Sequence, residues 1–232
     1  MKCAIMQPTY LPWAGYFNLI AQVDVFVFLD DVQHERQSWQ SRNRILLNNQ
    51  PYWISLPVKR LTHSQIINTI ELDDMRNWRR KHLQLLEQTY SKHPYRREIL
   101  NDIQCLSDKS INYLADLNIH LVRKFSDSLG LTTSFLRASD LNIGGKRSEH
   151  LYKICDYLNC DTYLSPLGSK EYLQEDRVFD NSAIKLLFQE YEPLPYPQLK
   201  CPNFISHLSI IDVIANNGWH KTLEYVQTGK II

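Results

Sequence analysis

Residues 2–29 read KCAIMQPTYLPWAGYFNLIAQVDVFVFL, and this stretch decides the fold. Residues 2–7 and 23–29 are short apolar runs rich in β-forming side chains, with the length expected of buried strands. Between them, apolar residues recur at helical spacing over residues 13–20. Such a β-turn-α-β unit normally gives adjacent parallel strands, with ligands bound at the carboxyl edge of the sheet. The stretch therefore predicts an α/β fold.

The rest of the chain extends this pattern around a helical middle. Residues 44–72 contain β-like segments, and residues 74–130 carry apolar side chains at helical intervals. Further strands are predicted at residues 134–138, 162–165 and 183–189, and further helices at residues 149–157 and 208–216, the last capped by Gly218. We expect residues 1–232 to form one composite α/β domain with a mainly parallel, HUP- or Rossmann-like sheet. The helical segment 74–130 is inserted between its two halves.

Composition excludes several classes of protein. The net charge is +1, from 26 basic and 25 acidic residues, so no global field draws the chain to DNA. No apolar run approaches the roughly 18 residues that would span a membrane, and no export signal opens the chain. The 5 cysteines form no CxxC pair, which favours reduced thiols. We expect a cytoplasmic protein without membrane insertion.

A loop rich in aromatic side chains follows the first predicted strand. Two prolines and a glycine constrain this loop, and the helix after it presents free N–H groups to an anion. The substrate-binding candidates in it are Gln7, Tyr10, Trp13, Gly15 and Tyr16, with the aromatic rings stacked on a base or sugar. The alternative is that the aromatic residues fill the core at a strand-to-helix corner.

Two carboxylates end the second predicted strand. Asp30 and Asp31 stand where acid/base or ribose-binding groups stand in α/β proteins, so they are the catalytic candidates. Arg42 is expected to clamp a diphosphate, with Asn43 beside it. Alternatively, the two aspartates cap the next element and the arginine lies on a solvated strand edge.

Two later turns carry polar groups. Residues 144–149 read GGKRSE before an apolar helix, so backbone N–H groups and Lys146 could hold phosphate oxygens, although the Walker pattern is incomplete. Beyond the strand at residues 162–165 lie Ser165, Gly168, Ser169 and Tyr172, which are further substrate-binding candidates. An ordinary turn with a helix cap is the alternative in both places. The 8 histidines are scattered, and the sequence predicts no metal site.

Taken together, these segments resemble the WbqC-like protein family. The motifs that carry the resemblance are MQPTYLPWAGYF, FLDDVQ, SWQSRNRI, YWISLPVK, YLSPLGSKEYL, FQEY, PYPQ and FISHLSIIDVIANNG. They run from Met6 to about Gly218. Members are associated with O-antigen and related polysaccharide biosynthesis, and the resemblance implies glycyl transfer to an amino sugar.

Three hypotheses follow for the function. The first is an acyl or aminoacyl transferase that acts on a nucleotide-linked amino sugar, with an aminoacyl-tRNA, a carrier-protein thioester or an adenylate made from ATP and Mg²⁺ as donor. Because the opening is also similar to HUP-type enzymes, the second is a nucleotidyltransferase or ATP-dependent ligase, although Trp13 and Tyr16 stand where those enzymes carry catalytic histidines. The third is a non-catalytic sugar-nucleotide-binding or scaffold protein.

The candidate residues make a geometric prediction. Loops that follow parallel strands emerge at one edge of the sheet, where a reversal in strand order opens a crevice. We therefore expect residues 8–16, 30–44, 144–148 and 165–172 to line one cleft.

Overall fold

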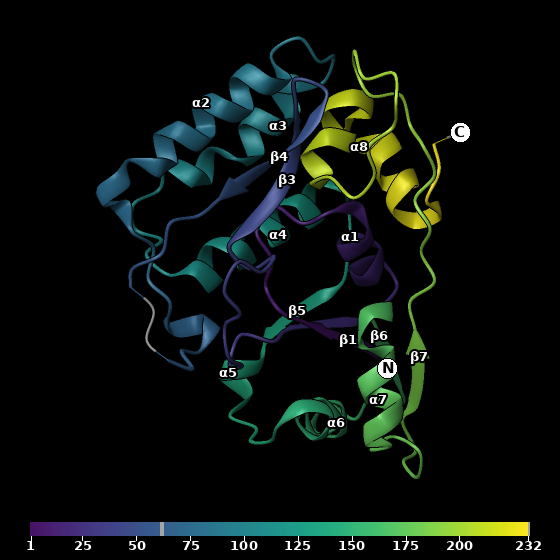
Figure 1. The fold of residues 1–232 in the computed structure, drawn as a ribbon. Coiled ribbons are helices and arrows are strands. Elements are labelled where there is room, and N and C mark those ends of the chain that lie inside the picture. Colours follow the sequence, from purple (N-terminus) through teal and green to yellow (C-terminus); the bar gives the residue numbers. More distant parts are fainter. Residues whose placement is uncertain (61–62, 232) are drawn as a thin grey trace.

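A computed structural model shows a five-stranded parallel sheet with the strand order β5-β2-β1-β6-β7 (Figure 1). The structure describes residues 1–60 and 63–231, so residues 61 and 62 of the predicted β-rich stretch lie outside it. The strands are β1 Lys2–Met6, β2 Val25–Phe28, β5 Ser134–Arg137, β6 Thr162–Ser165 and β7 Lys185–Phe188. The predicted α/β class with a mainly parallel sheet is confirmed.

Both faces of the central strands are buried, which explains their nearly continuous apolar sequences. Successive side chains of a strand point to opposite faces of the sheet. Ala4 and Phe26 join one apolar core, which also contains residues of the first helix, the helical middle and the C-terminal helix. Cys3 and Val25 join a second core with Leu151 of the helix that precedes β6.

The described residues contain eight α-helices. These are α1 Ala14–Ala21, α2 Trp78–Tyr90, α3 Arg96–Asp102, α4 Leu114–Ser128, α5 Ala138–Leu141, α6 Arg147–Tyr157, α7 Lys170–Asp176 and α8 Ile210–Thr228. Short 3-10 helices lie at Ile67–Thr69, Asp74–Arg76, Gln104–Ser107 and Leu167–Ser169. Helices α2 to α4 fall between β4 and β5 in the chain and supply the predicted helical middle (Figure 1).

Two predicted elements differ in the structure. Strands β3 Arg42–Leu47 and β4 Gln50–Ser55 form an antiparallel hairpin apart from the main sheet, and the segment predicted as a further strand contains the 3-10 helix Ile67–Thr69 instead. Gly218 does not end the last helix. It interrupts α8 with φ 74° and ψ 172°, and the helix then resumes to Thr228. A Cβ at Gly218 would lie 2.8 Å from the Tyr95 ring, so close packing explains the glycine.

The strand order reverses beside β1, and the sheet opens there. From β1 the chain moves outward through β2 to β5, and it returns to the other side of β1 for β6 and β7. β1 pairs with β2 as far as Met6, but with β6 only from Lys2 to Cys3. The carboxyl halves of β1 and β6 therefore separate, which creates a crevice at the position where open α/β sheets bind ligands.

Candidate functional site

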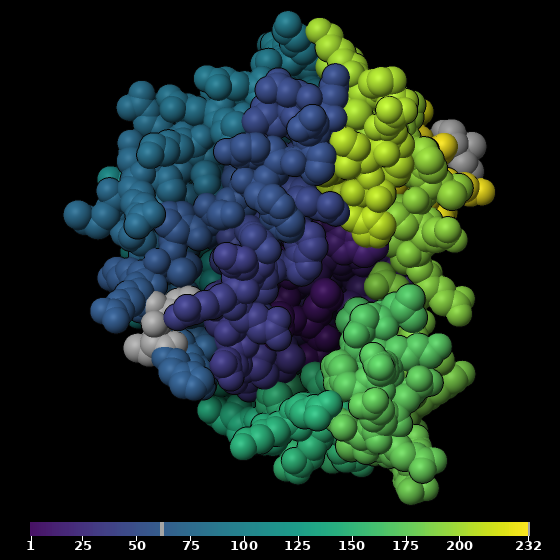
Figure 2. All heavy atoms as spheres, in the orientation of Figure 1, coloured from purple at the N-terminus to yellow at the C-terminus, as the bar shows by residue number. Residues whose placement is uncertain are grey.

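Two adjoining pockets lie at the carboxyl edge of the sheet, one beside the ends of β1 and β6 and the other between the end of β2 and the start of α6, and together they are called the cleft here. The small pocket has a volume of about 270 Å³, and the large pocket has a volume of about 740 Å³. Both are lined by Gln7, Leu29, Glu35, Leu151 and Tyr172, so they are continuous. Figure 2 shows the hollow, with N-terminal residues at its floor between the violet-blue segment after β2 and the green segment around α7.

A carboxylate and an imidazole form a pair in the large pocket. Nε2 of His150 lies 3.2 and 3.0 Å from the two carboxylate oxygens of Asp31. The Asp31 side chain is 21% exposed, whereas that of His150 is 5% exposed. Asp31 therefore offers its carboxylate to the cleft while the imidazole holds it from behind. Nδ1 of His150 is buried without a hydrogen-bond partner in the part of the chain that the structure describes, so Nε2 is the ring nitrogen that donates to Asp31.

The turn before α6 brings His150 to Asp31. His150 is in the first turn of α6, five residues after Gly145. A Cβ at Gly145 would lie 2.8 Å from the His150 backbone Cα, so this close approach requires glycine. Gly145 thus allows the geometry of the pair.

Two cations border the same pocket at the start of α6. Lys146 and Arg147 are both exposed and line the large pocket. The Arg147 guanidinium lies 5.9 Å from the centre of the Tyr172 ring, and its Nε lies 3.7 Å from a carboxylate oxygen of Asp176. Burial raises the pKa of Tyr172, so its phenol remains a hydrogen-bond donor at neutral pH. This end of the cleft combines positive charge, the N-terminus of a helix and a neutral donor, which suits an anionic ligand.

The floor of the cleft is fixed by a pair of amides. Nε2 of Gln40 donates to Oε1 of Gln7 over 2.7 Å, and Oε1 of Gln40 accepts the backbone N–H of Glu35. The Tyr16 hydroxyl donates to the backbone carbonyl of Gln7 over 3.0 Å. These bonds orient Gln7, which lines both pockets.

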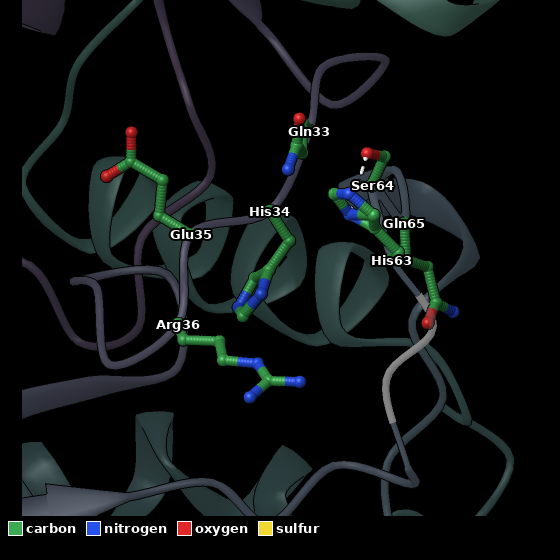
Figure 3. A pocket seen from close by; sticks show the side chains of 7 residues that line it. All are labelled: Gln33, His34, Glu35, Arg36, His63, Ser64 and Gln65. Carbon is green, nitrogen blue, oxygen red and sulfur yellow. Dashed lines mark hydrogen bonds between the residues drawn. The ribbon is translucent and has the colours of Figure 1, made fainter.

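A third pocket of about 410 Å³ adjoins the cleft, and it is called the side pocket here (Figure 3). Its lining residues are Gln33, His34, Glu35, Arg36, His63, Ser64 and Gln65. In Figure 3 the His34 and Arg36 side chains extend to one side of their segment, and Glu35 extends away from them. Burial lowers the pKa of His34, which favours a neutral ring at pH 7. Since Gln33 and Glu35 line both this pocket and the large pocket, the two are neighbours.

All four loops expected at the cleft contribute residues to its lining. Five of the predicted site residues lie in the lining, namely Gln7, Asp31, Lys146, Ser169 and Tyr172. The loop of residues 8–16 contributes Thr9, which lines the small pocket. The structure thus brings together residues that are far apart in the sequence.

The aromatic residues of the first loop have a different place. Tyr10 and Tyr16 are buried in the core, and the Tyr10 hydroxyl is hydrogen-bonded to Nδ1 of His82 over 2.9 Å. The Trp13 indole packs against the His207 ring, with centroids 4.7 Å apart, and it covers Gly15, where a Cβ would clash with it at 2.2 Å. The expected stacking of these rings on a ligand is therefore corrected: they form the corner between strand and helix.

Asp30 also departs from the expectation. Its carboxylate is fully buried, and it accepts hydrogen bonds from Arg137 Nε at 2.8 Å and from the backbone and hydroxyl of Ser139 at 3.0 and 2.9 Å. A carboxylate so enclosed cannot reach a substrate. Of the two predicted catalytic residues, Asp31 is the one that faces the cleft.

The remaining predicted residues lie beside the cleft without lining it. Arg42 stacks over Trp53 at 4.2 Å, and Asn43 is buried and donates to the Tyr10 carbonyl over 3.0 Å. The buried Ser165 hydroxyl donates to Oγ of Ser169 over 3.1 Å, whereas Gly168 is exposed. Asn43 and Ser165 therefore support neighbours of the cleft, and the diphosphate contact expected of Arg42 finds no support in its position.

Sequence reasoning missed His150 and Trp39. The signal for His150 was its place four residues after Lys146, because residues i and i+4 lie on one side of a helical turn. Trp39, which lines the small pocket, lies in the same polar loop as Gln40. Only the fold shows that this loop returns to the end of β1.

Two further observations concern metal binding and membrane spanning. Among the described residues, no group of three or more His, Cys, Asp or Glu side chains is arranged to hold a metal ion. No helix over residues 1–60 and 63–231 is both long and apolar enough to cross a membrane.

The fold and the cleft define a class: an α/β protein with a doubly wound parallel sheet and a polar site at its switch point. The chain belongs to the WbqC-like protein family, whose model matches residues 7–224, so the resemblance expected from the motifs is confirmed. It is 33% identical over 222 residues to Uncharacterized protein Rv1507c of Mycobacterium tuberculosis (strain ATCC 25618 / H37Rv), with 94% of each chain covered. No solved structure matches the chain.

Proposed function

We propose that this protein is a cytoplasmic transferase of surface-polysaccharide biosynthesis, which moves an acyl group such as glycyl onto the amine of a nucleotide-linked amino sugar. The observation that carries the proposal is the Asp31–His150 pair, because it places an oriented carboxylate in the same pocket as Lys146. The association of the family with O-antigen biosynthesis supports the choice of substrate.

In this proposal the start of α6 holds the diphosphate. Lys146 supplies a point charge, and the first N–H groups of the helix donate to phosphate oxygens. The Tyr172 hydroxyl donates from the other wall. These contacts would place the amino sugar toward Asp31, which lies in the same pocket.

Asp31 would be the base, with His150 as its positioning residue. An amino sugar binds as an ammonium ion, which has no lone pair for attack. Asp31 takes one of its protons, and the neutral amine then attacks the acyl carbonyl of the donor. The new C–N bond forms as the ester, thioester or acyl-phosphate bond of the donor breaks. The leaving oxygen or sulfur takes the electron pair, and the second proton of the amine passes to this leaving group as the amide forms.

The test is a mass measurement on the sugar. The purified protein is incubated with nucleotide-linked amino sugars and three donor systems: aminoacyl-tRNA, a carrier thioester, and glycine with ATP and Mg²⁺. We expect a mass gain of one glycyl unit with one donor, lost in Asp31→Asn and retained in Asp180→Asn. Asp180 is a matched control, because it is 51% exposed in a surface ion pair with Arg177. No mass gain with any donor would contradict the proposal.

A second candidate is nucleotidyl transfer or ATP-dependent ligation, which the β-loop-α opening of the central strand favours. It predicts release of pyrophosphate from ATP or CTP with Mg²⁺. The position of Trp13 and Tyr16 away from the cleft lining counts against it, because those places would hold the catalytic groups. Binding of the sugar nucleotide without either reaction would indicate the scaffold role.

A further inference from the structure

Two exposed indoles stand together at the rim of the small pocket. Trp39 is 48% exposed and Trp53 is 41% exposed, and their ring centroids lie 5.2 Å apart. Trp39 belongs to the loop after β2 and lines the small pocket, whereas Trp53 lies on β4 of the hairpin. Large aromatic side chains that gather in the open beside a pocket are typical of a recognition surface.

The two rings are held in place by the protein itself. The Arg42 guanidinium lies 4.2 Å from the centre of the Trp53 ring, and that of Arg44 lies 5.7 Å from the Trp39 ring. The backbone carbonyl of Trp39 accepts the N–H of Tyr10 over 3.0 Å. Trp39 is therefore a platform that is supported from behind before any ligand arrives, which lowers the entropic cost of binding.

The small pocket combines flat faces with polar edges. Trp39 comes from the loop after β2, and Tyr172 comes from α7 beyond β6. Because β2 and β6 lie on opposite sides of β1, the two rings belong to opposite walls. Met6 and Pro166 add apolar lining, and Gln7, Gln40 and Ser169 add amide and hydroxyl groups. A nucleobase has this combination, since its faces stack on aromatic rings and its edge forms hydrogen bonds.

We propose that the small pocket binds the nucleobase of the substrate against Trp39, while the attached phosphates lie in the large pocket beside Lys146. This deepens the proposed function and rests on it for the identity of the nucleotide-linked substrate. The continuity of the two pockets through Gln7 and Tyr172 allows one ligand to occupy both.

The test is a binding measurement that requires no transfer reaction. Titration calorimetry compares a panel of nucleoside diphosphates with ribose 5-phosphate and pyrophosphate, which carry no base. We expect at least one nucleoside diphosphate to bind more tightly than both base-free ligands. Trp39→Ala should weaken its binding about tenfold and leave pyrophosphate binding unchanged, and Trp39→Phe should restore most of the loss.

Tyr52→Ala is the matched control. Tyr52 is 46% exposed on the same hairpin, but as the neighbour of Trp53 on a strand it points to the opposite face. Its substitution should leave nucleotide binding within about twofold, well below the loss expected for a stacked base. Equal loss in Tyr52→Ala and Trp39→Ala, or equal affinity for nucleoside diphosphates and pyrophosphate, would overturn the inference.

A nucleobase could also come from the end of an RNA donor, so the panel includes the trinucleotide CCA. Trp39-dependent binding of CCA alone assigns the platform to the donor and overturns the inference for the nucleotide-linked substrate. Trp39-dependent binding of a nucleoside diphosphate without any glycyl transfer supports this inference and counts against the proposed function, so the two can fail separately.

Discussion

A closed region and an open region of the protein meet just after β2. Asp30 lies in the closed region, and its neighbour Asp31 lies in the open one. Around Asp30 the protein is closed, because Arg137 and Ser139 fill the hydrogen-bonding positions of a carboxylate with no exposed surface. Around Asp31 it is open, and among residues 1–60 and 63–231 one imidazole, that of His150, contacts a carboxylate that faces the large pocket. The same residue type, one position apart, has a structural role in one region and remains available for chemistry in the other.

The difference is one of hydrogen-bonding capacity. In the closed region, which extends to Tyr10 and the helical middle, the buried charges Asp30 and Arg79 are matched by neighbours: Arg79 donates to three backbone carbonyls and to Asp74. In the cleft, the side chains of Asp31 and Lys146 keep capacity for a ligand. Satisfied polar groups stabilise the fold, and partly satisfied groups in a pocket mark a site.

The largest expected difference between the regions concerns stability. Asp30→Asn replaces an oxygen with an amide group that faces N–H donors, so it should lower the free energy of unfolding by about 3–5 kcal/mol, the cost of breaking a buried pair. Asp31→Asn keeps an oxygen that accepts from Nε2 of His150, so it should change the free energy of unfolding by under about 1 kcal/mol. Urea unfolding of both variants checks this. Equal free energies of unfolding for Asp30→Asn and Asp31→Asn would contradict the distinction between a structural Asp30 and an available Asp31.

The closed region should also respond to pH through His82. Burial lowers the pKa of His82 to about 4 from the usual 6.5, so between these values the unfolded chain binds the proton more readily than the folded protein. The free energy of unfolding should therefore fall as the pH drops from 6.5 to 4, by about 3 kcal/mol.

His82→Gln keeps an acceptor for the Tyr10 hydroxyl and should remove this dependence. Burial raises the pKa of Asp212 to about 6, so this group makes the free energy of unfolding rise as the pH falls over part of the same range. The quantity to compare is therefore the difference in the free energy of unfolding between wild type and His82→Gln at each pH. Identical pH profiles for wild type and His82→Gln would show that His82 is not responsible.

In the cleft, a smaller effect is expected from one cation. Lys146→Ala should weaken binding of a nucleoside diphosphate about tenfold, or about 1.4 kcal/mol, without affecting stability. Lys153→Ala is the matched control, because Lys153 lies on the same helix in an ion pair with Glu149. Calorimetry should show a loss in the first variant alone, and a similar loss in both would point to a general effect of surface charge.

The sequence predicts most of the sheet but not the path of the chain between β2 and α2. Buried parallel strands have short apolar sequences that stand out locally, and all five were expected near their observed places. The segment at Ile67–Thr69 has a similar apolar sequence, yet packing against α4 turns it into a 3-10 helix, a tertiary effect that periodicity does not record.

The site could be predicted as a set of loops, but only partly as residues. The four loops follow from the topology of a parallel sheet. Which side chains face the cleft depends on orientation over one or two positions, as Asp30 and Asp31 illustrate. The prediction that Tyr10 and Tyr16 stack on a ligand was wrong, because a dense aromatic cluster is as typical of a core as of a binding site.

The most direct test of the account is the effect of Asp31→Asn on transfer and on substrate binding, measured separately. We predict that single-turnover glycyl transfer slows by about 100-fold or more, while the Kd of the nucleotide-linked amino sugar stays within about threefold, because a general base acts in the chemical step. Transfer at the wild-type rate in Asp31→Asn would contradict the central claim that the open carboxylate at the end of β2 performs the chemistry.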